Sequence, residues 1–148
     1  MKEIKITFTN GAVISAGVRE SEEPELAESM QRFFEEPKKL ICHNTLSTGD
    51  SFAAFPRPPK SPVKAGHLGK TIGRNRLHYT ELKAGDLIWS GTKLYVCYGK
   101  CTEPGLIGAV VAQVKQEEIP EFVRACNDVR NHTYFYHKMA VITVERGN

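Results

Sequence analysis

Residues 84–99, Ala-Gly-Asp-Leu-Ile-Trp-Ser-Gly-Thr-Lys-Leu-Tyr-Val-Cys-Tyr-Gly, are the stretch that decides the fold. Two apolar runs, residues 87–89 and 94–98, lie on either side of a turn that contains Gly91. Runs rich in β-forming residues around such a turn predict a β-hairpin. Because both runs are nearly continuous rather than alternating, we expect the hairpin to be covered on both faces, at the centre of the core.

The chain before this hairpin predicts four strands and one helix. Residues 4–8 alternate apolar and polar, and Asn10-Gly11 is a strong turn signal before a second strand at 13–18. A helix should follow from a start around residues 21–25, with a capping hydroxyl, acids and a proline, to an end near Pro37. Its apolar stripe is Leu26, Met30 and Phe33. Residues 39–44 and 51–55 predict two further strands.

The chain after the hairpin predicts a strand, a helix and a closing strand. Residues 106–114 are apolar apart from Gln113 and predict a strand, and Ile119-Pro120 opens a helix with one apolar side. Residues 134–136 and 139–144 should form the last strand or hairpin. Many short strands with two lone helices favour a mainly β fold, a closed antiparallel barrel capped by two helices. With 148 residues, we expect a single domain over 1–148.

The composition gives no indication of a nucleic-acid-binding, secreted or membrane protein. The chain is 41% hydrophobic and 25% charged with a net charge of +3, which is ordinary for a globular protein and gives no argument for nucleic acid. The N-terminus is charged and lacks the apolar core of a signal peptide. No apolar run approaches the roughly 20 residues of a membrane span. We therefore expect a cytoplasmic protein with no membrane partner.

The spacing of the cysteines and histidines does not predict a metal site. Cys97 and Cys101 form the one close cysteine pair, and Cys42 and Cys126 supply no matching second pair. We expect buried, reduced thiols, with a redox pair or a metal site as alternatives. The five histidines show no ligand spacing, so we predict no metal and no cofactor. His78, just before the central hairpin, is the preferred acid–base candidate, and a hydrogen-bonded structural histidine is its alternative.

The segment from residue 56 to 76 differs from the rest of the chain. It contains four prolines, six Lys or Arg residues and no acidic residue. A connection of this length without periodicity is usually functional or disordered. Its guanidinium, ammonium and exposed backbone N–H groups could hold a carboxylate or phosphate. The alternative is a solvated basic loop without a ligand.

The order of elements resembles the cyclophilin-like fold, and more closely a family of small prokaryotic cyclophilin-like proteins of unknown function. The pieces that carry this resemblance span most of the chain apart from the basic segment. They are residues 39–43, Tyr79, residues 84–88, Tyr98-Gly99, residues 107–111 leading into the helix around Phe122, and residues 139–142. The resemblance implies a barrel that binds a small molecule or a peptide.

The resemblance does not carry over prolyl isomerase activity. Cyclophilins have a catalytic arginine in a Phe-His-Arg strand, followed by a Gln-Gly-Gly-Asp loop. The similar strand here is residues 51–56, with Ala54 where the arginine is expected, and no such loop follows. Arg57 is three residues further on, and a misplacement of about 1 Å already costs catalysis heavily. We predict negligible isomerase activity.

These observations predict a small anionic ligand near the barrel mouth. We expect Arg57 and Asn75 to be its polar anchors, with His78 nearby, and Trp89 and Tyr98 to form walls of the pocket. Core packing is the alternative for these aromatic residues, together with Tyr95, Tyr134 and Tyr136. An interaction module that binds a peptide or a subunit, including a second copy of the chain, is the alternative function. Nucleic-acid binding through the basic segment is a weaker third interpretation.

Overall fold

The central hairpin forms as predicted and is buried on both faces. The computed structural model describes residues 2–57 and 73–147, and in it β6 (Asp86–Trp89) pairs with β7 (Leu94–Cys101), with Trp89 opposite Leu94. Every residue of β6 is buried, and so are residues 94–98 of β7. The prediction of a hairpin covered on both faces is confirmed.

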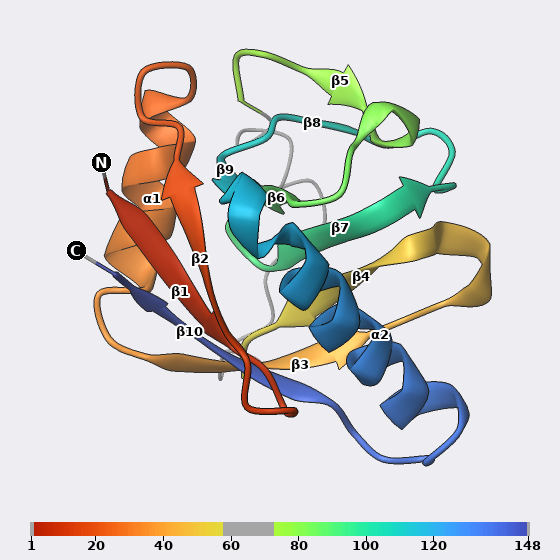
Figure 1. Cartoon of the computed structure of the whole chain (residues 1–148). Helices are drawn as coiled ribbons and strands as arrows, with labels where there is room; N and C mark the ends of the chain where they lie inside the picture. The colour runs from red at the N-terminus through yellow and green to blue at the C-terminus, as the bar shows by residue number, and fades with distance from the viewer. Residues whose placement is uncertain (1, 58–72, 148) are drawn as a thin grey trace.

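The hairpin is part of a closed antiparallel barrel, which has eight strands among the described residues (Figure 1). The order around the barrel is β1-β10-β3-β4-β7-β6-β9-β2, and β2 pairs back with β1. Besides the hairpin, the strands are β1 (Glu3–Thr7), β2 (Val13–Val18), β3 (Lys38–His43), β4 (Gly49–Phe55), β9 (Ala112–Val114) and β10 (Val141–Arg146). Closure removes the exposed strand edges that so many short strands would otherwise present. The predicted mainly β barrel is confirmed.

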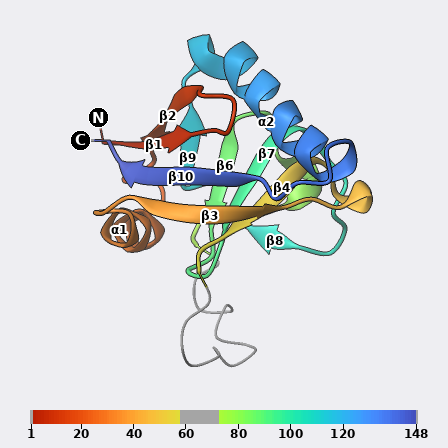
Figure 2. The same cartoon turned by 90° about the horizontal axis from the view of Figure 1, so that it is seen from below.

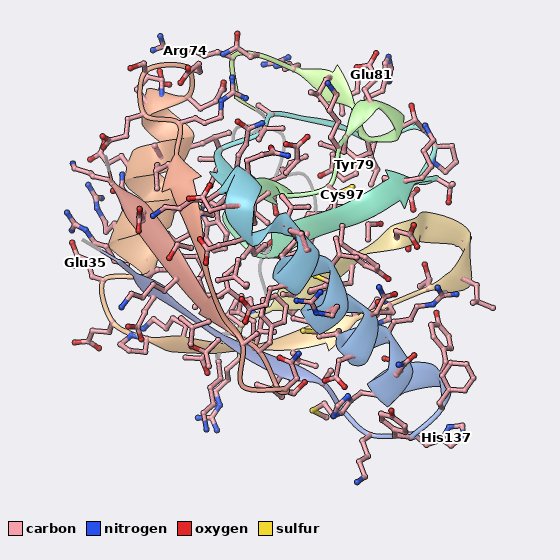
Figure 3. All side chains as sticks on the ribbon, viewed as in Figure 1. Glu35, Arg74, Tyr79, Glu81, Cys97 and His137 are labelled. Atoms are coloured by element: carbon pink, nitrogen blue, oxygen red, sulfur yellow. The ribbon has the colours of Figure 1, made fainter. Side chains whose placement is uncertain are left out.

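The two faces of β7 contribute to different cores. Leu94, Val96 and Tyr98 belong to the large apolar cluster inside the barrel. Tyr95 and Cys97 belong to a smaller cluster on the outside of the barrel wall. In Figure 3, Cys97 and Tyr79 lie close together in that outer cluster. A strand with a core on each side explains why its sequence is continuously apolar.

A small second sheet covers the outer cluster. Residues 106–114 were predicted as one strand, but they form two: β8 (Ile107–Gly108) pairs with β5 (Leu77–His78), and β9 pairs within the barrel. The chain changes partner between them, where the Val111 N–H donates to the Leu87 carbonyl at 2.9 Å. Apolar periodicity could not show this change, because buried segments read the same in either sheet.

Two helices pack on opposite sides of the barrel (Figures 1 and 2). Helix α1 (Pro24–Phe33) buries the predicted Leu26 and Met30, and Phe33 is partly buried beside them. It begins after Glu23 rather than at the predicted Ser21 cap. No helix in the described part of the chain is long and apolar enough to cross a membrane.

Helix α2 (Ile119–Tyr134) is longer than predicted. Its buried face includes Phe122, Cys126 and Val129, as expected. The predicted strand around 134–136 is wrong, because the helix continues to Tyr134 and the Phe135 N–H still donates to the Asn131 carbonyl at 2.9 Å. Helix packing against the barrel thus overrides the β preference of Tyr134, and Phe135 and Tyr136 follow the helix in a turn and a bend rather than in a strand.

Leu94 tests the central role of the hairpin. Its side chain is fully buried inside the barrel, so Leu94→Ala should lower the free energy of unfolding by about 2–5 kcal/mol. Leu46→Ala makes the same chemical change at a side chain that is 74% exposed, and should change it by less than about 0.5 kcal/mol. Urea unfolding of both variants measures the difference. Equal effects would contradict the assignment of Leu94 to the core.

Candidate functional site

A small cavity lies between the end of β3, the beginning of β4, the middle of β7 and the last turns of α2. We call it the Tyr98 cavity. Its volume is about 60 Å³, and its walls are formed by Asn44, Thr45, Leu46, Gly49, Asp50, Tyr98, Arg130 and Tyr134. Leu46 is 74% exposed, so the cavity meets the protein surface at this residue. It has room for about four water-sized spheres.

Tyr98 is the deepest member of the wall. It is 4% exposed and belongs to the barrel core, with its ring 6.3 Å from that of Phe52. Its hydroxyl oxygen is buried and has no hydrogen-bond partner among the described residues. Burial raises the pKa of Tyr98 to about 12, with a further contribution from the negative charge of Asp50. The phenol is therefore a protonated donor at neutral pH with nothing to donate to.

Tyr134 supplies a second hydroxyl of the same kind. It is the last residue of α2, and its hydroxyl oxygen is also buried without a partner among the described residues. Buried polar groups in folded proteins are nearly always hydrogen-bonded, and each exception calls for an explanation. Two exceptions in the wall of one cavity indicate a site that a water molecule or a ligand completes.

Asp50 is held in place by an irregularity of the barrel. The register between β4 and β7 shifts here, since Gly49 lies opposite Cys101 but Ser51 lies opposite Cys97. The Asp50 carboxylate packs against Gly99, where an added Cβ would lie 2.5 Å from the Asp50 Oδ2 atom. Such irregularities in strand pairing are common beside functional sites, where they re-aim a side chain.

Arg130 supplies the positive charge of the cavity. It lies one helical turn before Tyr134, with its guanidinium carbon 6.0 Å from the centre of the Tyr134 ring. Among the described residues, neither Arg130 nor Asp50 forms an ion pair or a side-chain hydrogen bond. A partly buried cation and a partly buried anion thus line one cavity without satisfying each other.

The hollows beside α1 are larger, but their charged groups are already paired. A groove of about 430 Å³ is lined by Ser29, Phe33 and Trp89, among others. The Trp89 indole N–H donates to the Ser29 hydroxyl at 3.0 Å, and its ring packs 5.0 Å from the ring of Phe33. Both carboxylates in this groove are bonded, Glu28 to Arg32 and Glu25 to Arg74. It offers no uncommitted charge to a ligand.

A second hollow beside α1, of about 290 Å³, is also lined by ion pairs. Lys2 pairs with Glu20 at 3.1 Å, and Arg146 with Glu35 at 3.9 Å. Its one uncommitted polar atom is the Oε1 atom of Gln31, which is buried without a partner among the described residues. Of these three hollows among the described residues, the Tyr98 cavity has the most unsatisfied polar groups.

The end of the basic segment binds an internal carboxylate. Glu23 is 1% exposed, and its carboxylate accepts hydrogen bonds from the backbone N–H groups of Arg74 and Asn75 and from the Asn75 amide at 3.2 Å. Arg74 also pairs with Glu25 (Figure 3 labels Arg74 above α1). Residues 58–72, which hold the middle of the segment, lie outside the described residues.

The five predicted site residues lie in different places. Tyr98 lines the cavity, whereas Trp89 is 1% exposed and lines the groove beside α1. Asn75 is bonded to Glu23, Arg57 is exposed just after β4, and His78 is exposed in β5. None of the three hollows formed by described residues contains all five.

The two charged members of the cavity, Asp50 and Arg130, were not predicted as site residues from the sequence. Tyr134 was predicted on a strand, as one of the aromatic residues that pack in the core or line a pocket, and the structure places it on α2. The sequence did contain one indication of Asp50, because it is an acidic residue directly before the apolar strand predicted over residues 51–55. No local pattern connects it to Arg130, because the two residues meet only through the packing of α2 on β4 and β7.

The cysteines do not contribute to a reactive site. All four are buried as free thiols, and burial raises the pKa of Cys42 and Cys97 to about 12. The prediction of buried thiols is confirmed. In residues 2–57 and 73–147, no group of three or more His, Cys, Asp or Glu side chains is arranged to hold a metal ion.

Comparisons with known proteins identify the fold and no family. No family model matches the chain, and no curated protein matches its sequence. Among solved structures, the barrel is similar to McbB, whose structure was determined in complex with tryptophan, with a TM-score of 0.80 and 23% sequence identity. The match covers 98% of this chain but 45% of that one, so this chain spans less than half the length of McbB. At this identity the similarity concerns the fold alone.

Two tyrosines on β7 test whether the cavity is unsatisfied. Tyr98 and Tyr95 are both 4% exposed, but the Tyr95 hydroxyl bonds to the Ser51 hydroxyl at 2.7 Å, whereas that of Tyr98 has no described partner. In urea unfolding, Tyr98→Phe should leave stability unchanged or raise it by up to about 1 kcal/mol, and Tyr95→Phe should lower it by about 1 kcal/mol. A clear loss of stability in Tyr98→Phe would show that its hydroxyl is already bonded in the free protein.

Proposed function

We propose that this protein binds a small molecule bearing a carboxylate in the Tyr98 cavity, with Arg130 as the ion-pair partner. The observation that carries the proposal is the combination of an unpaired guanidinium with two buried hydroxyls that lack partners, all in the walls of one cavity. A ligand there is the partner that these groups lack. This agrees with the small anionic ligand predicted from the sequence, but places it at the α2 side of the barrel.

Arg130 suits this role for a physical reason. A guanidinium binds a carboxylate through two parallel hydrogen bonds, and such charge-assisted bonds are about twice as strong as neutral ones. Arg130 is partly buried, so solvent screens it less than it would a fully exposed arginine. The protonated phenols of Tyr98 and Tyr134 would add neutral donors to the same carboxylate.

The similarity to McbB supports this class of ligand. Tryptophan, with which that protein was solved, is a small molecule with a carboxylate. The basic segment gives another position for the same ligand, beside Arg57, Asn75 and His78. The exposure of Arg57 and His78 favours this position, but the bond from the Asn75 side chain to Glu23 weakens it.

An interaction module is the second candidate function. The chain after α2 exposes three large apolar side chains within five residues: Phe135 is 71% exposed, Tyr136 52% and Met139 69%. His137, labelled in Figure 3 at this end of the molecule, has a φ of 52°, which is unusual for a residue with a side chain. Clustered exposed apolar residues often mark a surface that binds a peptide or another subunit. This surface is separate from the ion-pair argument at Arg130.

Arg130→Gln tests the proposed site. Thermal shift and calorimetric titration with propionate and 4-methylpentanoate, at constant ionic strength, should show binding to the wild type that weakens at least tenfold in the variant, because a charge-assisted bond contributes about 1.5–3 kcal/mol. Arg124→Gln, an exposed arginine on the same helix, is the matched control and should bind like the wild type. Binding that survives Arg130→Gln but is lost in Arg57→Ala would place the site at the basic segment instead.

Prolyl isomerase activity should be negligible even if the barrel is cyclophilin-like. Ala54 is fully buried in β4 and cannot stabilise charge on a twisted amide, and such electrostatic groups are worth a factor of about 10² to 10³ each. A protease-coupled assay on an X-Pro peptide measures this. Activity within tenfold of an ordinary cyclophilin, abolished by Arg57→Ala, would show that Arg57 has taken the catalytic role.

A further inference from the structure

We infer that the ligand of the Tyr98 cavity is an α-amino acid, whose ammonium pairs with Asp50 while its carboxylate pairs with Arg130. This inference rests on the proposed function, because it assumes that the cavity binds a carboxylate. It adds a second charge to the ligand and therefore a chemical class. The juxtaposition that carries it is one unpaired anion and one unpaired cation in the wall of the same small cavity.

Asp50 makes a plain carboxylate a weaker ligand than a zwitterion would be. It is partly buried, has no ion pair among the described residues, and lies close enough to influence the pKa of Tyr98. Its carboxylate occupies the space beside Gly99 that a Cβ at that position would fill. A second negative charge in the cavity would be repelled by Asp50, and partial burial would strengthen that repulsion. An ammonium on the neighbouring carbon turns this repulsion into attraction.

The other simple ligand classes fit the walls less well. A phosphate or sulfate carries more negative charge past Asp50 than a carboxylate does. A metal cation or a simple amine would be repelled by Arg130 and would leave the hydroxyl donors of Tyr98 and Tyr134 without an acceptor. A zwitterion with its ammonium and carboxylate on one α-carbon uses both Asp50 and Arg130, and its carboxylate accepts from the phenols.

The size of the cavity selects which part of an amino acid enters. A volume of about 60 Å³ holds a carboxylate, the α-carbon and the ammonium, but no large side chain. The side chain must leave where the cavity meets the surface, beside the exposed Leu46. Contact with an exposed leucine favours an apolar side chain, so we expect leucine and phenylalanine to bind more tightly than serine or aspartate.

Matched ligand pairs test the inference. Calorimetric titration compares leucine with 4-methylpentanoate and phenylalanine with 3-phenylpropionate, pairs that differ only in the ammonium. The wild type should bind the amino acid at least tenfold more tightly than its deaminated partner. Asp50→Asn should abolish this preference, lowering amino-acid affinity while leaving or raising that of the carboxylate. Glu121→Gln, an exposed acid on α2, makes the same charge change away from the cavity and should leave the preference intact.

The outcomes separate this inference from the proposed function. Equal affinity of the wild type for both members of each pair would overturn the amino-acid assignment while leaving carboxylate binding in place. If neither member binds, the proposed function fails as well. The wild-type comparison does not depend on how well Asp50→Asn folds. Circular dichroism shows whether that variant is folded, and only then does its binding result test the role of Asp50. A preference that survives in folded Asp50→Asn would also overturn the role given to Asp50.

Discussion

The structure depends on one strand, β7, that is buried on both faces. A strand in this position has no solvent to satisfy its polar side chains, so each must find a partner in the protein. Tyr95 does so on the outer face, where its hydroxyl bonds to Ser51. Tyr98 does not on the inner face, although it is equally buried. The contrast between two tyrosines of the same strand makes the cavity at Tyr98 a site that lacks a component.

The two helix-covered sides of the barrel differ in whether their charged side chains are paired. Beside α1, the rings of Phe33, Phe34 and Trp89 pack within 5.3 Å of one another, and the surrounding charges are paired. On that side, these apolar and charged groups all have partners within the protein. Beside α2, Arg130 and Asp50 have no ion-pair partner among the described residues and line one cavity. Leaving two partly buried charges uncompensated costs stability, and proteins usually accept such costs at sites of function.

The fold was largely predictable because its signals are local. Continuous apolar runs around Gly91 predicted the central hairpin, and the spacing of apolar residues predicted the buried faces of both helices. The errors have physical causes. Helix α2 continues to Tyr134 because its packing on the barrel outweighs β preference there, and residues 106–114 divide between two sheets that sequence periodicity cannot distinguish.

The site was much less predictable because its parts are distant in the sequence. Tyr98, predicted as a pocket wall because it is an aromatic residue on a barrel strand, does line this cavity. Asp50 and Arg130 meet only when β4 pairs with β7 and α2 packs across them, and the register shift that places Asp50 against Gly99 leaves no pattern in either strand. Asn75 was predicted as a ligand anchor because it lies in the basic segment, but its side-chain amide donates to the carboxylate of Glu23.

A crystal structure of the protein grown with leucine is the most direct test of this account. It should show the amino acid in the Tyr98 cavity, with its carboxylate on the Arg130 guanidinium and within hydrogen-bond distance of the Tyr98 hydroxyl, and its ammonium on Asp50. Leucine bound elsewhere, such as in the groove beside Trp89, with only ordered water between Arg130 and Tyr98, would contradict it.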